Sequence, residues 1–267
     1  MGANSSYLPL GWRQVADACA HARLGHVVVY HPSIGSTNTA ARALARAGAL
    51  DGTVVLADEQ TQGRGRHGRR WVAPPCSGIA VSIVLRPAAD FPLHTLTMAS
   101  ALAAGDVVRA LVGPARCTLK WPNDVLVDGA KVGGILLELD QSGASWTVVI
   151  GIGLNVNAAP DLPDVCSLAG ATGHAIAREP LLIDLLATLE AYVALTAREP
   201  DTTPRLWRAR LVTLGQLVRV RAADGLFEGV AVDVDREGAL LVRLPDGTLR
   251  PVRAGDVTLS RKSAPPQ

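Results

Sequence analysis

The 267-residue chain is poor in aromatic residues, lysine and paired cysteines, and each shortage narrows what the protein can be. Aromatic residues make up 4% of the sequence against 48% hydrophobic residues, so a large core has to be built from aliphatic side chains. The four cysteines show no Cys-x-x-Cys spacing, which argues against a zinc site and favours reduced thiols in a cytoplasmic protein. No apolar run reaches the roughly 18 residues that span a bilayer, so no membrane association is expected.

The net charge of 26 − 24 = +2 is too small to indicate binding to nucleic acid or to an anionic membrane. The basic residues are almost all arginine, because the only lysines are Lys120, Lys131 and Lys262. Two lysines thus stand eleven positions apart in the middle of an arginine-rich chain. Since the compact ammonium of lysine binds anions differently from the planar guanidinium, Lys120 and Lys131 are candidate anion ligands. Chance placement on the surface is the alternative.

The apolar pattern predicts a leader over residues 1–20 and a mixed α+β domain over 21–212. Within that domain, Asp128-Gly129 is a strong signal for a tight turn that joins two strands of a hairpin. Polar residues from Ser36 precede strong helix formers, as at the start of a helix. Strands are expected at 27–30, 54–57, 79–85, 119–121, 125–127, 131–139 and 146–152, and helices at 40–47, 94–112, 181–197 and 203–212.

The pattern changes at Thr213, where short strands alternate with Asp-Gly and Glu-Gly turns about every 10 residues. This spacing predicts a small antiparallel β-barrel over residues 213–262, followed by a tail over 263–267. Residues 1–20 are too short for a helix-turn-helix domain, so DNA binding by that route is not expected.

The segment from Gly63 to Trp71 reads GRGRHGRRW and concentrates four arginines and three glycines in eight positions. Glycine lets the backbone approach a ligand closely, and arginine binds phosphate or carboxylate through paired hydrogen bonds. The spacing is not that of a P-loop. An anion site therefore competes with two alternatives, a solvated loop that binds nothing and a segment that binds an RNA backbone. The lack of interleaved aromatic residues weighs against RNA.

A second motif, Lys120-Trp121-Pro122-Asn123-Asp124, stands at the expected end of a strand. Strand alternation places Lys120 and Pro122 on one side and Leu119 and Trp121 on the other. If the lysine side faces a cleft, its ammonium is partly desolvated and available to an anion, and an exposed lysine on an edge strand is the alternative. Asp124 either orients Lys120 or the hairpin that follows, or binds Mg²⁺, and the orienting role is favoured.

Together the two motifs suit the activation of a carboxylic acid by ATP. A site that joins a carboxylate to the α-phosphate of ATP brings two anions together and needs several cations focused on one spot. A mobile arginine loop above a fixed lysine would supply them. Closure of residues 61–71 would also keep water away from a reactive mixed anhydride.

The motifs occur in an order that resembles the biotin protein ligase family. The matching blocks lie within residues 30–160, and they are Ser36-Thr37-Asn38, Glu59-Gln60, GRGRHGRRW from Gly63, KWPNDV from Lys120, KVGGILLE from Lys131 and GIGLNV from Gly151. The resemblance implies an α+β catalytic domain of the biotin–lipoate ligase type, with a mixed sheet flanked by helices as in class II synthetases. It also implies an SH3-like C-terminal domain, and it fits the short monofunctional form without a DNA-binding domain.

The resemblance implies a two-step reaction. Biotin and ATP, with Mg²⁺ carried by the nucleotide rather than by an assigned protein site, would give biotinyl-5′-AMP and pyrophosphate. Biotin would then pass to a lysine of the biotin carboxyl carrier domain of a biotin-dependent carboxylase. The expected protein is a monomer or weak homodimer. The alternatives are a lipoate-type acyl-protein ligase and a noncatalytic RNA-binding module.

The resemblance also implies roles for individual residues, with Lys120 and Arg66 as the catalytic pair. The glycines of the set are expected to form a floor on which a side chain would collide with the ligand. The biotin site would be formed by Ser36, Thr37, Asn38, Gln60, Arg64, Gly65, Arg66, Lys120, Gly133, Gly134, Gly151 and Gly153. The ATP and adenylate site would be formed by Arg64, Arg66, Arg69, Trp71, Lys120, Asn123, Lys131 and Asn155.

Overall fold

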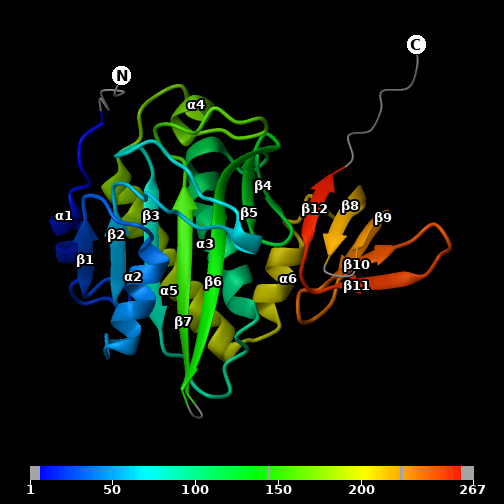
Figure 1. The fold of residues 1–267 in the computed structure, drawn as a ribbon, viewed down its shortest axis with the longest axis horizontal. Helices are drawn as coiled ribbons and strands as arrows, with labels where there is room; N and C mark the ends of the chain where they lie inside the picture. The colour runs from blue at the N-terminus through cyan, green and yellow to red at the C-terminus, as the bar shows by residue number, and fades with distance from the viewer. Residues whose placement is uncertain (1–6, 143–144, 223–224, 260–267) are drawn as a thin grey trace.

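The computed structural model describes residues 7–142, 145–222 and 225–259. A seven-stranded mixed sheet with helices on both faces forms the larger domain, and a five-stranded antiparallel sheet forms a C-terminal domain beside it (Figure 1). This confirms the expected α+β class and the small β domain. The tail expected at 263–267 lies outside the described residues.

The large sheet has the strand order β1-β2-β3-β7-β6-β5-β4. Strands β1 and β2 are parallel, and every other neighbouring pair is antiparallel. The central strands β6 and β7 form a hairpin, and β3 pairs with β7 although about seventy residues separate them in the sequence. The strands are β1 (Val28–His31), β2 (Val54–Ala57), β3 (Ile79–Leu85), β4 (Cys117–Lys120), β5 (Asp124–Val127), β6 (Ala130–Ser142) and β7 (Ser145–Leu154).

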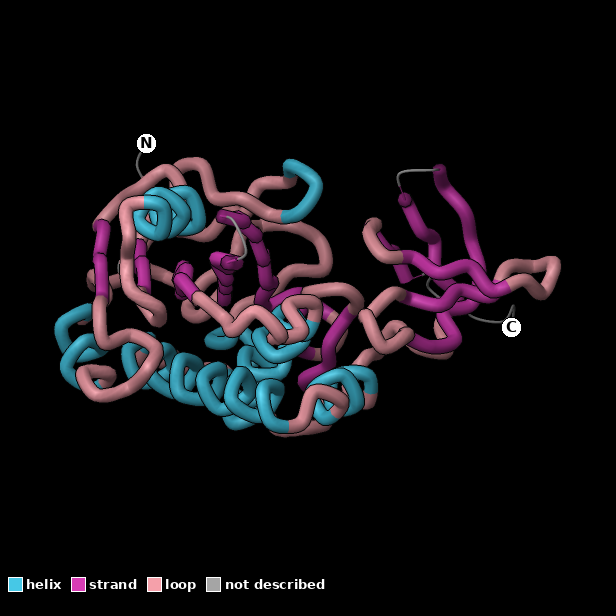
Figure 2. The backbone as a smooth tube through the Cα atoms, turned by 90° about the horizontal axis from the view of Figure 1, so that it is seen from below, coloured by secondary structure: helices cyan, strands magenta, loops and turns pink. Residues whose placement is uncertain are grey.

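The helices cover the two faces of this sheet unequally (Figure 2). Helix α2 (Thr37–Arg46) packs on one face, against β2, β3 and β7, and Ser36 caps its first turn. Helices α1 (Trp12–Ala18), α3 (Thr95–Val112), α5 (Arg178–Arg198) and α6 (Thr202–Arg208) form a layer on the other face, and the short α4 (Leu168–Thr172) contacts α3. The face that carries α2 is therefore the more open one.

Helices α3 and α5 are long and apolar enough to cross a membrane by length and composition alone. Helix α3 is mostly buried, however, and it packs against both α5 and the strands of the sheet. Its apolar residues are those of a core helix, since an element that is hydrophobic on every side belongs in the interior of a domain.

The segment around α1 is anchored to the main core. Val15 of α1 is fully buried, and the backbone N–H of Leu10 donates to both carboxylate oxygens of Asp58 at 3.1 Å. Arg178 pairs with the same carboxylate at 2.9 Å and also donates to the carbonyl oxygen of Leu8 at 2.6 Å. The Asp58–Arg178 pair is almost completely buried, so it ties the N-terminal segment and α5 to the sheet.

The hairpin between β5 and β6 turns at Asp128 and Gly129, where both φ angles are positive, 51° and 82°. This backbone suits the twist of the two strands and favours glycine at the second position. A register shift between Val125 and Leu126 lets Asp124 face Gly134 across the hairpin. Asp124 therefore lies beside the start of β6.

The C-terminal domain consists of β8 (Leu217–Ala222), β9 (Gly225–Val234), β10 (Leu240–Arg243), β11 (Leu249–Val252) and β12 (Asp256–Leu259), in the order β11-β10-β9-β8-β12. Several contacts join it to the larger domain. The indole Nε1 of Trp121 donates to the carbonyl oxygen of Gly238 at 2.9 Å. Arg208 of α6 pairs with Asp233 of β9 at 2.5 Å.

Candidate active site

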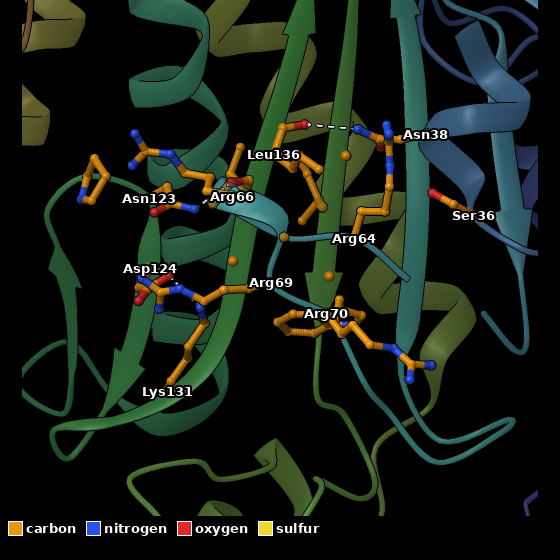
Figure 3. Close-up of a pocket in the computed structure, with 18 of the residues that line it drawn as sticks. Ser36, Asn38, Arg64, Arg66, Arg69, Arg70, Asn123, Asp124, Lys131 and Leu136 are labelled. Carbon is orange, nitrogen blue, oxygen red and sulfur yellow. Dashed lines mark hydrogen bonds and ion pairs between the residues drawn. The ribbon is translucent and has the colours of Figure 1, made fainter. Parts of the chain in front are cut away.

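The motifs separated in sequence meet at one cavity of about 890 Å³, which includes the space at its open mouth (Figure 3). Its lower surface is formed by β6 and β7, and the arginine loop lies across it. The predicted site residues that line it are Ser36, Thr37, Asn38, Gln60, Arg64, Gly65, Arg66, Arg69, Trp71, Lys120, Asn123, Lys131, Gly134, Gly151 and Gly153.

One end of the cavity carries a connected set of polar groups at the start of α2. The backbone N–H of Thr37 donates to Gln60 Oε1 at 2.9 Å, and its hydroxyl lies 3.1 Å from the same oxygen. The Ser82 hydroxyl donates to Asn38 Oδ1 at 2.6 Å. These bonds fix the directions of short donors and acceptors, as recognition of a small polar group requires.

Glu138 of β6 joins this polar end to the arginine loop. Its carboxylate accepts from Asn38 Nδ2 at 2.9 Å, from Arg42 at 3.1 Å, and it forms an ion pair with Arg64. Glu138 had no predicted role, and its place at the end of the KVGGILLE block was the only signal in the sequence. In the structure its side chain is 17% exposed.

Arg66 and Lys120 carry charges that the cavity leaves uncompensated. Among the described residues neither side chain forms an ion pair or a hydrogen bond, whereas Arg64, Arg69 and Lys131 each pair with a carboxylate. Burial lowers the pKa of both side chains, and the nearby carboxylate of Asp124 partly opposes the shift. Two partly buried cations in one cavity favour an anion as the ligand.

Trp71, Lys131 and Asp124 form the other end of the cavity. The Lys131 ammonium pairs with Asp124 at 2.6 Å and lies 5.9 Å from the centre of the Trp71 ring. The predicted partner of Asp124 was Lys120 or the hairpin, and the ion pair that forms is with Lys131 of the hairpin. The indole Nε1 of Trp71 is buried without a hydrogen-bond partner among the described residues, so it can still donate to a ligand.

Two glycines of the predicted floor lie beneath protein side chains. A Cβ on Gly151 would lie 2.1 Å from Asn38 Oδ1, and one on Gly153 would lie 2.5 Å from the Trp71 ring. Both residues do line the cavity. Their lack of a side chain therefore makes room for the groups that would contact a ligand, rather than for the ligand itself.

Gly133 and Asn155 were expected in the site but do not line the cavity. A Cβ on Gly133 would lie 2.5 Å from Leu154 Cδ2, so this glycine allows β6 and β7 to pack. Asn155 is 1% exposed and donates to the carbonyl oxygen of Cys166 at 3.2 Å. The nucleotide contact that its motif position indicates stays a prediction.

The C-terminal domain also contributes to the cavity, which the sequence could not indicate. Asp256 and Val257 of β12 line it, and Asp256 forms an ion pair with Arg69 of the loop. Arg70 lines the cavity too, but Figure 3 shows its side chain directed away from the centre, where it donates to the carbonyl oxygen of Thr61.

Comparison with known proteins agrees with this arrangement of motifs. Residues 30–155 match the model of the biotin/lipoate A/B protein ligase family, and residues 213–260 match that of the biotin protein ligase C-terminal domain. The chain is 39% identical to the biotin–[acetyl-CoA-carboxylase] ligase of Mycobacterium tuberculosis, over 92% of this chain and 89% of that protein. The chain belongs to the biotin protein ligase family. The corresponding ligase of Paracoccus denitrificans is 40% identical over 79% of this chain and 92% of its own length.

Solved structures of the biotin protein ligase family share the fold. The biotin protein ligase of Aquifex aeolicus, in complex with biotin and ATP, superposes with a TM-score of 0.74 at 25% identity. The superposition covers 88% of this chain and 99% of that one, so it includes both domains. The two-domain arrangement is thus shared with a family member that holds both small molecules.

Proposed function

We propose that the protein activates biotin with ATP and transfers it to a lysine of a biotin carboxyl carrier domain. The observation that carries the proposal is that two partly buried cations without an ion-pair partner among the described residues, Arg66 and Lys120, line the same cavity. A neutral ligand would leave both charges uncompensated, whereas a carboxylate beside a phosphate would use both.

In the first step, the polar groups of Ser36, Thr37 and Asn38 bind the ureido end of biotin. The biotin carboxylate then lies towards Arg66 and Lys120, which reduce its repulsion from the α-phosphate of ATP. A carboxylate oxygen attacks the α-phosphorus, the bond to the β-phosphate oxygen breaks, and pyrophosphate leaves with that electron pair. The two cations stabilise the charge that builds up on the phosphorus oxygens.

Magnesium would accompany ATP rather than occupy a cage of protein ligands. Among the described residues no three His, Cys, Asp or Glu side chains gather as a metal site requires. Mg²⁺ commonly binds through substrate phosphates, several waters and one or two carboxylates, and Asp124 is the cavity carboxylate that fits this part. When bound there, the ion would neutralise phosphate charge.

In the second step, the neutral amine of the carrier lysine attacks the acyl carbon of biotinyl-5′-AMP. The bond from that carbon to the phosphate oxygen breaks, AMP leaves, and the nitrogen loses a proton. The arginine loop has to keep water away from the acyl carbon until the lysine arrives. The proposed partner is the carrier domain of a biotin-dependent carboxylase. The enzyme is proposed to act in the cytoplasm as a monomer or weak homodimer.

The proposal is tested by ATP–pyrophosphate exchange with biotin or lipoate as the acid. We expect exchange with biotin and none with lipoate. Exchange with lipoate alone would indicate the lipoate-type ligase instead. Salt-dependent retention of RNA, without ATP–pyrophosphate exchange with biotin or with lipoate, would indicate the noncatalytic RNA-binding module.

The pH dependence of exchange is expected to report the charge of Lys120. Burial lowers the pKa of this ammonium, so the charged form is lost as the pH rises through a value below that of ordinary lysine. Exchange should therefore fall on the alkaline side, and Lys120→Arg should move that fall to higher pH because a guanidinium stays protonated. The same alkaline fall in the Lys120→Arg variant would show that another group titrates.

Replacing Glu138 with glutamine is expected to raise the KM for biotin by about 10- to 150-fold, because loss of a charged hydrogen-bond partner costs ~1.5–3 kcal/mol. The carboxylate orients both Asn38 and Arg64, which lie at the polar end of the cavity. The KM for ATP should change little. Steady-state pyrophosphate release at varied biotin and varied ATP measures both constants.

Asp140→Asn is the matched control for Glu138→Gln. Asp140 pairs with Arg42 at 2.7 Å, as Glu138 does at 3.1 Å, but it contacts Arg46 instead of the loop. Its KM for biotin should stay near that of the wild type. An equal rise in both variants would assign the effect to Arg42 and contradict the role given to Glu138.

A further inference from the structure

We propose that Asp256 of the C-terminal domain is a positioning residue that holds the arginine loop over the cavity through Arg69. The second domain then completes the site of the first, and its contribution is to retain the reactive intermediate. The consequence for catalysis rests on the proposed function, whereas the effect on the loop does not.

The arginine loop is built to move as one unit. The backbone N–H of Gly65 donates to the carbonyl oxygen of Arg69 at 2.7 Å, and that of Trp71 donates to Gly63 at 2.9 Å. These bonds close the loop on itself. A change in the position of Arg69 therefore also shifts Arg66, which lies between Gly65 and Arg69 in the sequence. The position of one arginine thus affects the cation at the reaction centre.

Ion pairs hold this unit at its two ends. Arg64 pairs with Glu138 of β6, which belongs to the same domain, and Arg69 pairs with Asp256 of β12, which belongs to the other. Arg66 lies between them in sequence and forms no ion pair among the described residues. Glu138 therefore fixes the end near the polar groups, and Asp256 fixes the end near Lys131 and Asp124.

Asp256 is held in place by contacts that do not involve the loop. Trp121 Nε1 donates to the carbonyl oxygen of Gly238, and the Trp121 backbone N–H donates to the hydroxyl of Thr213 at 2.9 Å, so the C-terminal domain is docked at two other points. Strand β12 pairs with β8 through Asp256 opposite Arg221, which sets the backbone of Asp256. The carboxylate is therefore a fixed point to which a moving loop can attach.

The strength of the Arg69–Asp256 pair suits reversible closure. The Arg69 side chain is 61% exposed and that of Asp256 is 33% exposed, and pairs of this kind shift an equilibrium only severalfold. The loop can therefore open for substrates and for the carrier lysine. The Asp256 charge also offsets that of Arg69, which otherwise adds to the repulsion among the cations of the cavity.

Loosening this contact should release the intermediate before transfer. Water would then attack the acyl carbon of free biotinyl-5′-AMP, the bond from that carbon to the phosphate oxygen would break, and biotin and AMP would form. Each such event consumes one ATP and releases one pyrophosphate without labelling a carrier. The ratio of pyrophosphate released to biotin transferred therefore rises when the Arg69–Asp256 contact is weakened.

The test compares Asp256→Asn with Asp233→Asn in the full chain. Asp233 also forms an arginine pair between the domains, but it does not line the cavity. We expect the ratio of pyrophosphate released to biotin transferred to rise about two- to fivefold in Asp256→Asn. It should stay at the wild-type value in Asp233→Asn and return towards it in Asp256→Glu. A wild-type ratio in Asp256→Asn, or an equal rise in both asparagine variants, would overturn the proposal.

Hydrogen exchange tests the same contact without any substrate. Amides of residues 63–71 should exchange about two- to fivefold faster in Asp256→Asn than in the wild type or in Asp233→Asn. Unchanged exchange in this segment would contradict the proposal even if the enzyme is active. Absence of biotin-dependent activity in the wild type, with faster exchange in Asp256→Asn, would contradict only the proposed function.

Discussion

Replacing Lys120 with alanine is expected to lower biotin-dependent ATP–pyrophosphate exchange by about 10²–10³-fold, the usual cost of removing one preorganised charge-stabilising donor. The ammonium lines the cavity, and among the described residues it has no ion-pair partner to compete with a phosphate. The loss should appear mainly in kcat, because the stabilised charge develops in the transition state. Steady-state exchange at saturating biotin and ATP measures it.

Arg116→Ala is the control for Lys120→Ala. Arg116 immediately precedes β4, and Lys120 ends that strand. The side chain of Arg116 is exposed and pairs with Asp128 at 2.6 Å. Removing this cation should leave exchange near the wild-type rate. Lys120→Arg should recover part of the activity, since charge is kept but its geometry changes. Near wild-type exchange in Lys120→Ala, with both variants folded, would exclude the proposed role.

Replacing Arg178 with methionine is expected to lower the free energy of unfolding by about 3–5 kcal/mol, because it leaves the buried Asp58 carboxylate without its cation. Arg178 and Asp58 are both about nine-tenths buried or more, and Arg178 also bonds the backbone of Gly78 and Leu8. The N-terminal segment should loosen together with the start of α5. Urea unfolding followed by far-ultraviolet circular dichroism measures the change.

The matched surface pair is Arg23–Asp51, which has a similar distance of 2.8 Å but side chains 39% and 33% exposed. Arg23→Met should cost no more than about 1 kcal/mol, because solvent screens exposed pairs. The difference between the two variants isolates the effect of burial. Similar losses in both would contradict the anchoring role assigned to the Asp58–Arg178 pair.

Local patterns in the sequence were sufficient to predict most elements and the broad fold. The Asp128-Gly129 turn, the polar start of α2 and the apolar runs of β2 and β3 each depend on neighbouring residues, and the structure has each of them. The fold class followed from these elements and from the family resemblance. Strand order did not, since the pairing of β3 with β7 joins segments about seventy residues apart.

The residues that line the cavity were predictable where a single local motif contains them, as for Arg66 and Lys120. It was not predictable where a contact depends on tertiary packing. The pairing of Glu138 with Arg64 requires the loop to lie over β6, and the pairing of Asp256 with Arg69 requires the docking of a second domain. The burial of Asn155 likewise depends on packing that no local pattern encodes.

The central claim is tested most directly by ATP-dependent transfer of labelled biotin to a biotin carboxyl carrier domain. A carrier with its acceptor lysine changed to arginine serves as the control. Label is expected on the intact carrier when protein, ATP and Mg²⁺ are all present, and none on the arginine variant. Absence of label on the intact carrier under those conditions, with the protein folded, would contradict the account.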